Sequence, residues 1–231
     1  MDKRITVAID GYSSTGKSTI AKQLASKLGY VYVDSGAMYR AMTLFSMQKG
    51  YISSSQFCVQ DLIDNLDNAS LEFIYNETLG FAEMYLNDVN VEKSIRSLEV
   101  SNLVSKVSAI PEVRKKLVAI QKEIGKNKAV VMDGRDIGSV VFTDAELKIF
   151  MTSSAETRAQ RRYDELIQKG EKVSYQDVFT NVVERDRVDT SRKDSPLVKA
   201  DGAIEIDNSQ LSKEKQFEII LKLVEEKLRD I

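Results

Sequence analysis

Short apolar runs alternate with amphipathic stretches along the first fifty residues of the chain. Residues 4–9, RITVAI, are short and rich in β-branched side chains, which predicts a buried strand. Residues 17–28 carry apolar side chains at helical spacing, and Gly29 suits the end of a helix. A second strand at 30–36 and a second helix at 37–50 repeat this order. Alternating strands and helices are typical of a parallel α/β sheet.

The middle of the chain has a different pattern. Apolar and polar residues alternate over 69–91 around the turn-forming sequence NETLG, which predicts a small antiparallel hairpin or meander. Two helices are expected next, at 94–109 and at 111–124, where Pro111 suits a first helical turn. The alternation then resumes, with strands expected at 129–134, 147–152 and 202–207 and helices at 155–169, from about 175, and at 212–228. Without a repeat or a Pro/Ser-rich linker, this pattern predicts one α/β domain with an inserted lobe.

Composition narrows the class of protein. The 231 residues are 42% hydrophobic and 29% charged, which is typical of a folded globular chain. The net charge of −2 argues against non-specific nucleic-acid binding. One cysteine, Cys58, and no histidine exclude a disulfide framework and argue against a zinc site. The N-terminal sequence lacks the apolar segment of a signal peptide, and no run approaches a membrane span, so we expect a cytoplasmic protein.

The segment between the first strand and the first helix carries the clearest chemistry. Gly11, four mixed residues, Gly16, Lys17 and Ser18 match the phosphate-binding pattern G-x-x-x-x-G-K-[ST]. Glycines at these positions let backbone N–H groups point at a phosphate, and the following helix adds the positive end of its dipole. The lysine can reach the β- and γ-phosphates, and the serine hydroxyl can ligate Mg²⁺. The segment therefore predicts a nucleoside-triphosphate site.

Two further polar segments follow predicted strands, at the sheet edge where α/β proteins bind ligands. In DSGAMYR, Asp34 or Ser35 is expected to cap the following helix. Arg40 fits a ligand-binding residue and an ordinary surface arginine equally well. In DGRD, a carboxylate could accept the exocyclic amine of a base while Arg135 holds a phosphate. A salt-bridged loop is the alternative interpretation of the second segment.

Arginines concentrate in two neighbouring helices between residues 155 and 192. Arg158 and Arg162 are four residues apart and share a helix face. A solvated charged face is the ordinary interpretation of such a run. Two like-charged clusters on adjacent helices repel, however, so an anion between them is the alternative, and a phosphate in transfer is such an anion.

Taken together, the motifs resemble the bacterial cytidylate kinases. The similarity covers nearly the whole chain, through IDGYSSTGKST, DSGAMYR, SKVSAIPEVRKKL, DGRDIGSVVF, KIFMTSSAETRAQRRYDEL, NVVERDRVDTSRKDSPL and AIEIDNS, in that order. The resemblance implies a three-layer P-loop NTPase fold with a central parallel sheet, an inserted nucleoside-monophosphate lobe near 36–110 containing a β-meander, and a helical lid near 155–172. It also implies transfer of the γ-phosphate of ATP to CMP or dCMP with Mg²⁺, by a single domain that we expect to be monomeric.

The same resemblance implies roles for individual residues. The ATP-binding residues would be Gly11, Tyr12, Ser13, Ser14, Thr15, Gly16, Lys17, Ser18 and Thr19, with Ser18 on the metal. The acceptor nucleotide would contact Ser35, Arg40, Ser105, Arg114, Arg135, Asp136, Arg185, Asp189 and Arg192. Ser105, Arg114 and Asp136 match the positions that bind cytosine, and Asp189 matches the carboxylate on the sugar. Catalysis would rest on Lys17, Arg158, Arg162 and Arg185.

Two departures from the family pattern lie in the phosphate loop, and other functions remain open at this stage. Tyr12 stands where proline is common and Ser14 where a glycine is usual, but neither is among the residues that define the loop. A phosphate-loop kinase acting on UMP, dephospho-coenzyme A or shikimate is the nearest alternative. A nucleotide switch or a nucleic-acid-stimulated NTPase is a more distant one, and a nucleotide-binding regulator without turnover is the least favoured.

Overall fold

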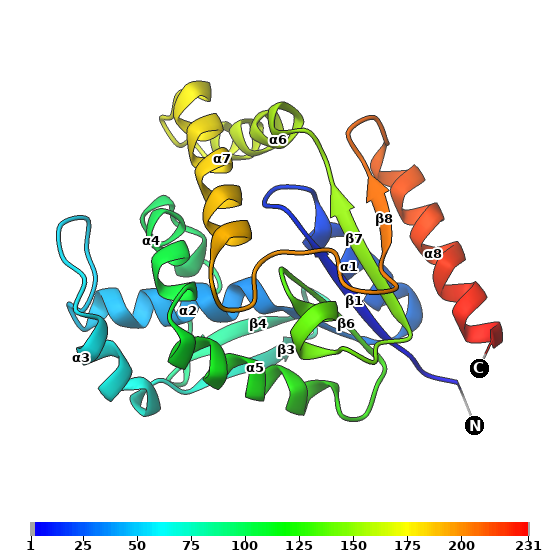
Figure 1. The fold of residues 1–231 in the computed structure, drawn as a ribbon, viewed down its shortest axis with the longest axis horizontal. Coiled ribbons are helices and arrows are strands. Elements are labelled where there is room, and N and C mark those ends of the chain that lie inside the picture. Colours follow the sequence, from blue (N-terminus) through cyan, green and yellow to red (C-terminus); the bar gives the residue numbers. More distant parts are fainter. Residues whose placement is uncertain (1–2, 231) are drawn as a thin grey trace. The chain divides into compact units, whose positions relative to one another are not determined.

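The computed structural model describes residues 3–230, and it is an α/β fold (Figure 1). Its contacts divide the chain into two compact units, which we call the sheet unit and the insert unit. The sheet unit contains the described residues up to Val31 and those from Asn127 onward, and the insert unit is Tyr32–Lys126. Over the described residues, no helix combines the length and apolar character needed to cross a membrane.

The main sheet has five strands in the order β2-β6-β1-β7-β8. Their bounds are Thr6–Gly11 for β1, Val31–Asp34 for β2, Val130–Gly134 for β6, Leu147–Thr152 for β7 and Ile204–Asp207 for β8. The central strand β1 is buried along its whole length and runs parallel to β6 and β7, with Val7 beside Val131 and Leu147. A strand buried on both faces needs a continuous apolar run, which explains the sequence TVAI. The predicted parallel sheet is confirmed.

Four helices accompany these strands in the sheet unit: α1 (Lys17–Leu28), α6 (Ala155–Gln168), α7 (Tyr175–Ser191) and α8 (Lys213–Asp230). Helix α1 packs against β6 and α8, while α6 and α7 lie side by side (Figure 1). Helix α8 carries an apolar stripe in which Ile220 and Val224 are buried and the other members are partly buried, namely Phe217, Leu221 and Leu228. Gly29 ends α1 in the left-handed conformation, with φ 64°, as its position predicted.

The connection from β1 to α1 depends on glycine at Gly11. Its φ is 145°, and a Cβ there would lie 2.0 Å from the carbonyl oxygen of Met151 on β7. No side chain fits at that distance, so the close approach of β1 and β7 requires glycine. Gly16, with φ 88°, then directs the chain into α1, where the N–H of Ile20 donates to the Gly16 carbonyl.

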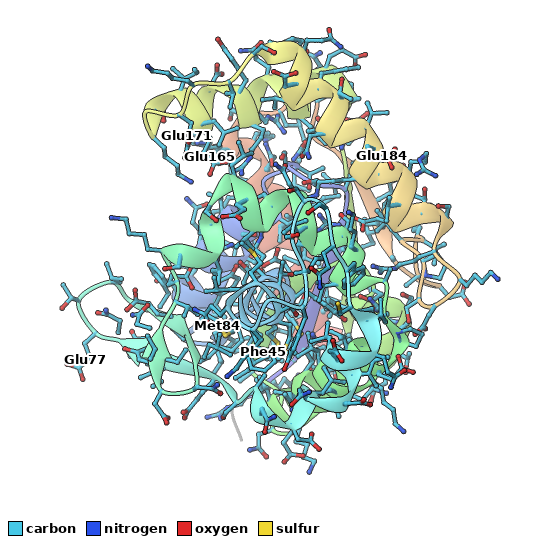
Figure 2. The ribbon with its side chains drawn as sticks, turned by 90° about the vertical axis from the view of Figure 1, so that its left-hand side faces the viewer. Phe45, Glu77, Met84, Glu165, Glu171 and Glu184 are labelled. Carbon is cyan, nitrogen blue, oxygen red and sulfur yellow. The ribbon has the colours of Figure 1, made fainter. Side chains whose placement is uncertain are left out.

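The insert unit combines helices with a second sheet. Its three antiparallel strands are β3 (Leu71–Asn76), β4 (Phe81–Leu86) and β5 (Val89–Asn90), which confirms the predicted meander. Its helices are α2 (Ser35–Gln48), α3 (Val59–Asp64), α4 (Leu98–Ser108) and α5 (Pro111–Gly125), with 3-10 turns at Leu66–Asn68 and Ser94–Arg96. Phe45 and Met84 lie in the core of the unit, whereas Glu77 is at the tip of the β3–β4 hairpin (Figure 2).

Several predicted boundaries were wrong for local reasons. Helix α4 begins at Leu98 rather than 94, because the Ser97 side chain accepts the N–H of Val100 and caps the helix there. Helix α2 begins at Ser35 rather than 37, because Asp34 caps it. Strand β1 runs two residues further than predicted, through Gly11. Neither α3 nor the π-type turn at Ile137–Val141 was predicted.

Candidate active site

The phosphate loop, residues 11–18, is held from within by its lysine. Lys17 Nζ donates to the carbonyl oxygen of Tyr12 at 2.5 Å and to Thr15 Oγ1 at 3.2 Å. Thr15 Oγ1 in turn donates to the Tyr12 carbonyl at 3.0 Å. Ser14 adopts φ 61°, a left-handed conformation that favours glycine, as the glycine usual at this position would allow. The loop is therefore shaped by contacts among its own residues.

Lys17 is a buried cation among other charges. Burial, and next the positive charge of Arg135, lower the pKa of Lys17 well below its ordinary value of 10.5. Asp133 and Asp10 act in the opposite direction. The side chain is 5% exposed, so little solvent reaches it. A bound polyanion would offset the desolvation of this ammonium group.

Ser18 is paired with a carboxylate at the end of the neighbouring strand. Its hydroxyl donates to Asp133 Oδ2 at 2.9 Å, and Asp133 is buried on β6. A serine hydroxyl and an aspartate are both hard oxygen ligands, which suit Mg²⁺. Magnesium typically takes only one or two protein ligands and completes its shell with water and phosphate oxygens. The residues present thus fit the metal that the triphosphate loop implies.

Asp10 fastens the strand before the loop to a distant turn. Its Oδ1 accepts the N–H of Ile137 at 2.8 Å, and its Oδ2 accepts that of Gly138 at 2.7 Å. Burial raises the pKa of Asp10 to about 6, although these two hydrogen bonds act to lower it. The segment it holds directly follows Arg135 and Asp136, so Asp10 fixes the backbone next to two predicted site residues.

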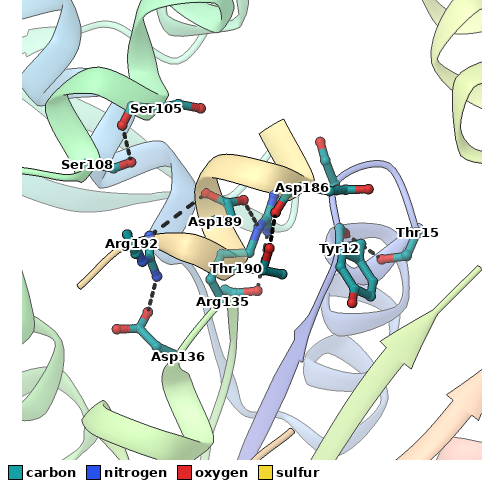
Figure 3. A network of polar contacts seen from close by, with 12 residues as sticks. Tyr12, Thr15, Ser105, Ser108, Arg135, Asp136, Asp186, Asp189, Thr190 and Arg192 are labelled. Carbon is teal, nitrogen blue, oxygen red and sulfur yellow. Dashed lines mark hydrogen bonds and ion pairs between the residues drawn. The ribbon is translucent and has the colours of Figure 1, made fainter. Parts of the chain in front are cut away.

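Arg135, Asp136, Asp189 and Arg192 form one network of opposite charges (Figure 3). Arg135 Nε donates to Asp189 Oδ2 at 2.8 Å. Arg192 lies 3.9 Å from both Asp136 Oδ1 and Asp189 Oδ1. Burial opposes the ionisation of Asp189, but the charges of Arg135 and Arg185 outweigh it and lower its pKa. The structure therefore brings together four residues that the sequence assigned to the acceptor nucleotide.

Arg185 lies close to Arg135 and Asp189, but burial and the charge of Arg135 outweigh the favourable charge of Asp189. Burial, and next the charge of Arg135, lower the pKa of its guanidinium to about 10, while Asp189 acts in the opposite direction. Its Nε is buried and has no hydrogen-bond partner within residues 3–230. A buried donor of a charged group usually has an acceptor, and its lack of one is typical of a ligand site.

The other arginines of α6 have partners of their own. Arg158 is 4% exposed; it donates to the carbonyl oxygens of Ser153 at 2.9 Å and Ser13 at 3.3 Å. Its Nη2 also pairs with Asp186 Oδ2 at 2.6 Å. Arg162 pairs with Glu165 at 2.8 Å on the same helix, where Figure 2 labels Glu165. The inference that the arginine clusters need an anion to relieve repulsion was therefore too simple, since interspersed carboxylates neutralise much of their charge.

The insert unit holds the remaining predicted acceptor residues. Asp34 Oδ1 accepts the N–H of Ala37, and its Oδ2 pairs with Arg96 at 2.8 Å. Burial opposes the ionisation of Asp34, but Arg96 outweighs it and lowers the pKa of Asp34. Ser35 is buried beside this cap. Arg40 donates to Ser101 Oγ at 2.8 Å, so it is anchored within the unit and is no free surface arginine.

Arg114 is the largest fully buried side chain of the insert unit, at 2% exposed. Its guanidinium carbon lies 5.5 Å from the centre of the Tyr39 ring, and its Nη1 donates to the Ser108 carbonyl at 3.3 Å. Ser108 Oγ donates in turn to the carbonyl oxygen of Ser105 at 3.2 Å (Figure 3). This chain of contacts joins Ser105 to Arg114, two of the three residues that the family resemblance assigned to cytosine.

Sequence reasoning missed the residues that act through distant partners. Asn208, fully buried, donates through Nδ2 to the Thr15 carbonyl at 2.6 Å and to Gln216 Oε1 at 2.8 Å, and it accepts from Arg161. Asp10 and the Asp133 contact with Ser18 were not assigned either. The sequence shows these residues only as polar side chains at the ends of strands, and that position does not indicate which residue each one contacts.

The parallel sheet and the loop that joins β1 to α1 define the chain as a phosphate-loop α/β protein. The fold is also found in a solved structure of an uncharacterized protein from Eubacterium ventriosum, with a TM-score of 0.50 at 11% identity over 97% of this chain and 99% of that one. Residues 7–226 match the family model described as cytidylate kinase, so the chain belongs to the cytidylate kinase family.

Curated relatives agree with this family. The cytidylate kinase of Flavobacterium johnsoniae is 67% identical over 222 residues, 96% of each chain. That of Flavobacterium psychrophilum is 65% identical, covering 96% of this chain and 98% of its own. That of Phocaeicola vulgatus is 55% identical over 210 residues, 91% of this chain and 92% of its own. The similarity extends along almost the full length of these relatives.

Proposed function

We propose that the chain transfers the γ-phosphate of ATP to CMP or dCMP, giving ADP and CDP or dCDP. The family supports the reaction, and the structural observation that carries it is Arg185, whose buried Nε has no hydrogen-bond partner in the described chain. Arg185 lies close enough to Arg135 and Asp189 for their charges to shift its pKa, so it belongs to the acceptor network. An anionic phosphate would supply the missing acceptor.

For the donor, residues Gly11 to Thr19 would hold the ATP phosphates through backbone N–H groups and Lys17. Ser18 and Asp133 would hold Mg²⁺. When bound with ATP, the metal neutralises phosphate charge and orients the transferred group. Lys17 would exchange its contacts with the Tyr12 carbonyl and Thr15 for phosphate oxygens, which restores the solvation lost on burial.

For the acceptor, Arg135, Arg185 and Arg192 would bind the phosphate of CMP, and Asp189 would accept hydrogen bonds from its sugar. Ser35 and Arg40 would contribute to the same nucleotide, while Ser105, Arg114 and Asp136 would read the cytosine. The charge pairs within each unit support these roles because they hold the side chains in fixed orientations. We assign the lobe near 36–110 to monophosphate binding and the segment near 155–172 to the lid, in a monomeric, cytoplasmic enzyme.

Phosphoryl transfer requires the protein mainly to position the two nucleotides and to stabilise negative charge. The attacking group is already an anionic phosphate oxygen, so no strong general base is needed, which fits a chain without histidine. Lys17, Arg158, Arg162 and Arg185 would stabilise the charge that spreads over the phosphoryl oxygens during transfer. Closure of the lid would exclude water and suppress hydrolysis of ATP.

The test is an assay of ADP release with Mg-ATP and a panel of acceptors: CMP, dCMP, UMP, AMP, GMP and none. We expect strong turnover with CMP and dCMP, weak turnover with UMP, and almost none without an acceptor. Lys17→Met should abolish the activity in a folded protein. ADP release that is independent of any acceptor would overturn the kinase assignment and leave an NTPase.

Base recognition has its own variant. Asp136→Ala should raise KM for CMP at least tenfold and KM for ATP much less, because the site loses the acceptor for the cytosine amine. The matched control is Asp144→Ala, which removes an exposed carboxylate from the loop between the turn at Ile137–Val141 and β7. Equal effects of Asp136→Ala on both substrates would show that the residue does not read the base.

A further inference from the structure

We propose that Tyr12 is a positioning residue that holds the guanidinium of Arg158 against the phosphate loop. The proposal rests on the proposed function only in that Arg158 is taken to act on the transferred phosphate. It concerns the aromatic side chain of Tyr12, which is separate from the contribution of its backbone to the loop.

The contact is a cation–π interaction backed by a second ring. The guanidinium carbon of Arg158 lies 5.1 Å from the centre of the Tyr12 ring. The Tyr12 ring itself meets Phe150 of β7 edge to face, with centroids 5.9 Å apart and an interplanar angle of 78°. Phe150 is buried in the sheet, so it fixes the tilt of the Tyr12 ring. The ring thus presents a fixed face to the cation.

Within the described residues, three polar contacts of Arg158 are made by the N–H groups of its guanidinium. Nε donates to the Ser153 carbonyl, Nη1 to the Ser13 carbonyl, and Nη2 pairs with Asp186. These bonds restrain individual nitrogen atoms, whereas the Tyr12 ring attracts the positive charge of the guanidinium as a whole. Tyr12 therefore adds an attraction that the three polar contacts do not supply.

The backbone and the side chain of Tyr12 serve different cations. The carbonyl oxygen accepts Lys17 Nζ, and this contact does not depend on the side chain. The ring contacts Arg158. One residue of the loop is thereby joined to both cations, and a side-chain substitution separates the two roles because it leaves the carbonyl in place. Figure 3 shows Tyr12 in the loop beside Thr15.

The first measurement compares Tyr12→Phe with Tyr12→Leu under saturating Mg-ATP and CMP. Phenylalanine keeps the aromatic face, and leucine keeps only bulk. We expect kcat of Tyr12→Phe to exceed that of Tyr12→Leu by roughly 3- to 20-fold, the range of a partly buried cation–π contact, with KM for CMP within twofold. Tyr75→Leu, which alters an exposed tyrosine of the β3–β4 hairpin, should leave kcat within twofold of the unaltered chain.

The second measurement separates positioning from general support of the fold. In an Arg158→Met background, exchanging Phe for Leu at position 12 should change kcat less than twofold, because the cation is gone. Thermal unfolding identifies folded variants, and Tyr12→Met replaces Tyr12→Leu if leucine does not fold. Equal kcat for the Phe and Leu variants, or the same ratio with and without Arg158, would overturn the proposal. Absence of CMP phosphorylation in the unaltered chain would instead overturn the proposed function.

Discussion

Asp10 shows how a single side chain can join two distant parts of the chain. Both of its carboxylate oxygens are used by backbone N–H groups 127 and 128 residues away, at Ile137 and Gly138. Burial makes the ionised form costly and raises its pKa to about 6. The residue therefore reduces stability at neutral pH while it fixes the turn that follows Arg135 and Asp136.

This shift predicts how the free energy of unfolding depends on pH. Because the pKa rises from 3.8 to about 6 on folding, the folded chain binds the proton more tightly. The stability gained in this way is complete below pH 3.8 and disappears as the pH rises through 6. Asn at this position does not titrate. Between pH 5 and 7.5, the unaltered chain should lose roughly 1.4 kcal/mol relative to Asp10→Asn, measured by urea unfolding. Parallel pH profiles for the two proteins would contradict the assigned titration.

For single residues, the sequence predicts a role well when the residue's partner is close to it along the chain. Asp34 was expected as a possible helix cap, and its side chain accepts the N–H of Ala37. Asp10 and Asn208 could not be predicted, because their partners lie far along the chain: Thr15 is 193 residues from Asn208. The roles given to Ser105, Arg114 and Arg185 came from the family resemblance, and spacing alone would not have supplied them.

The turn between β8 and α8 stabilises the phosphate loop from outside. Asn208 directly follows β8, and its backbone N–H donates to the Thr152 carbonyl of β7. Its side chain connects the Thr15 carbonyl of the loop to Gln216 of α8, and Arg161 of α6 donates to its Oδ1 and to its carbonyl oxygen. The Asn208 side chain thus connects the phosphate loop, α8 and α6. A residue that follows the last strand of the chain thereby stabilises the loop that follows the first strand.

Asn208→Ala should therefore weaken both the fold and ATP binding. It leaves the Thr15 carbonyl and Gln216 without their partner in a buried site, at a cost of about 2–4 kcal/mol in the free energy of unfolding. KM for ATP should rise at least fivefold, with a smaller change in KM for CMP. Gln210→Ala, two residues away at an exposed position, is the control and should change neither quantity. If Asn208→Ala has a normal KM for ATP, the turn does not support the loop.

Whole elements were predicted well where periodicity and end signals coincide. Helix α1 spans 17–28 as predicted, because Gly16 and Gly29 mark both ends. Helix α3 was missed because it is only six residues long and has one buried side chain, Leu62, so it shows no helical period. The π-type turn at Ile137–Val141 was missed because its first N–H groups are satisfied by Asp10, which no local pattern indicates.

For the molecule as a whole, the near-neutral composition conceals buried charge. The net charge is −2, yet Lys17, Arg114 and Arg158 are each no more than 5% exposed. Each of these three cations has an internal acceptor, whereas the buried Nε of Arg185 has no hydrogen-bond partner in the described chain and the pKa of Arg185 is lowered to about 10. A fold that keeps such a group without its anion reduces its own stability, and this is expected where the group serves a ligand.

Arg185→Met tests that relation between stability and ligand binding. Because the pKa of Arg185 falls to about 10, its charge opposes folding at neutral pH, and methionine fills a similar volume without charge. Without nucleotide, the variant should be more stable by about 1–3 kcal/mol, a rise in Tm of roughly 3–8 °C.

A CMP concentration one hundred times the Kd should stabilise the unaltered chain by about 2.7 kcal/mol, and the variant by less than half as much at the same concentration. The control is Arg187→Met on the same helix, which should affect neither result because, within the described residues, the exposed Arg187 side chain pairs only with Glu184, a residue labelled on α7 in Figure 2. A less stable Arg185→Met that keeps the full response to CMP would show that this arginine is structural and does not bind the phosphate.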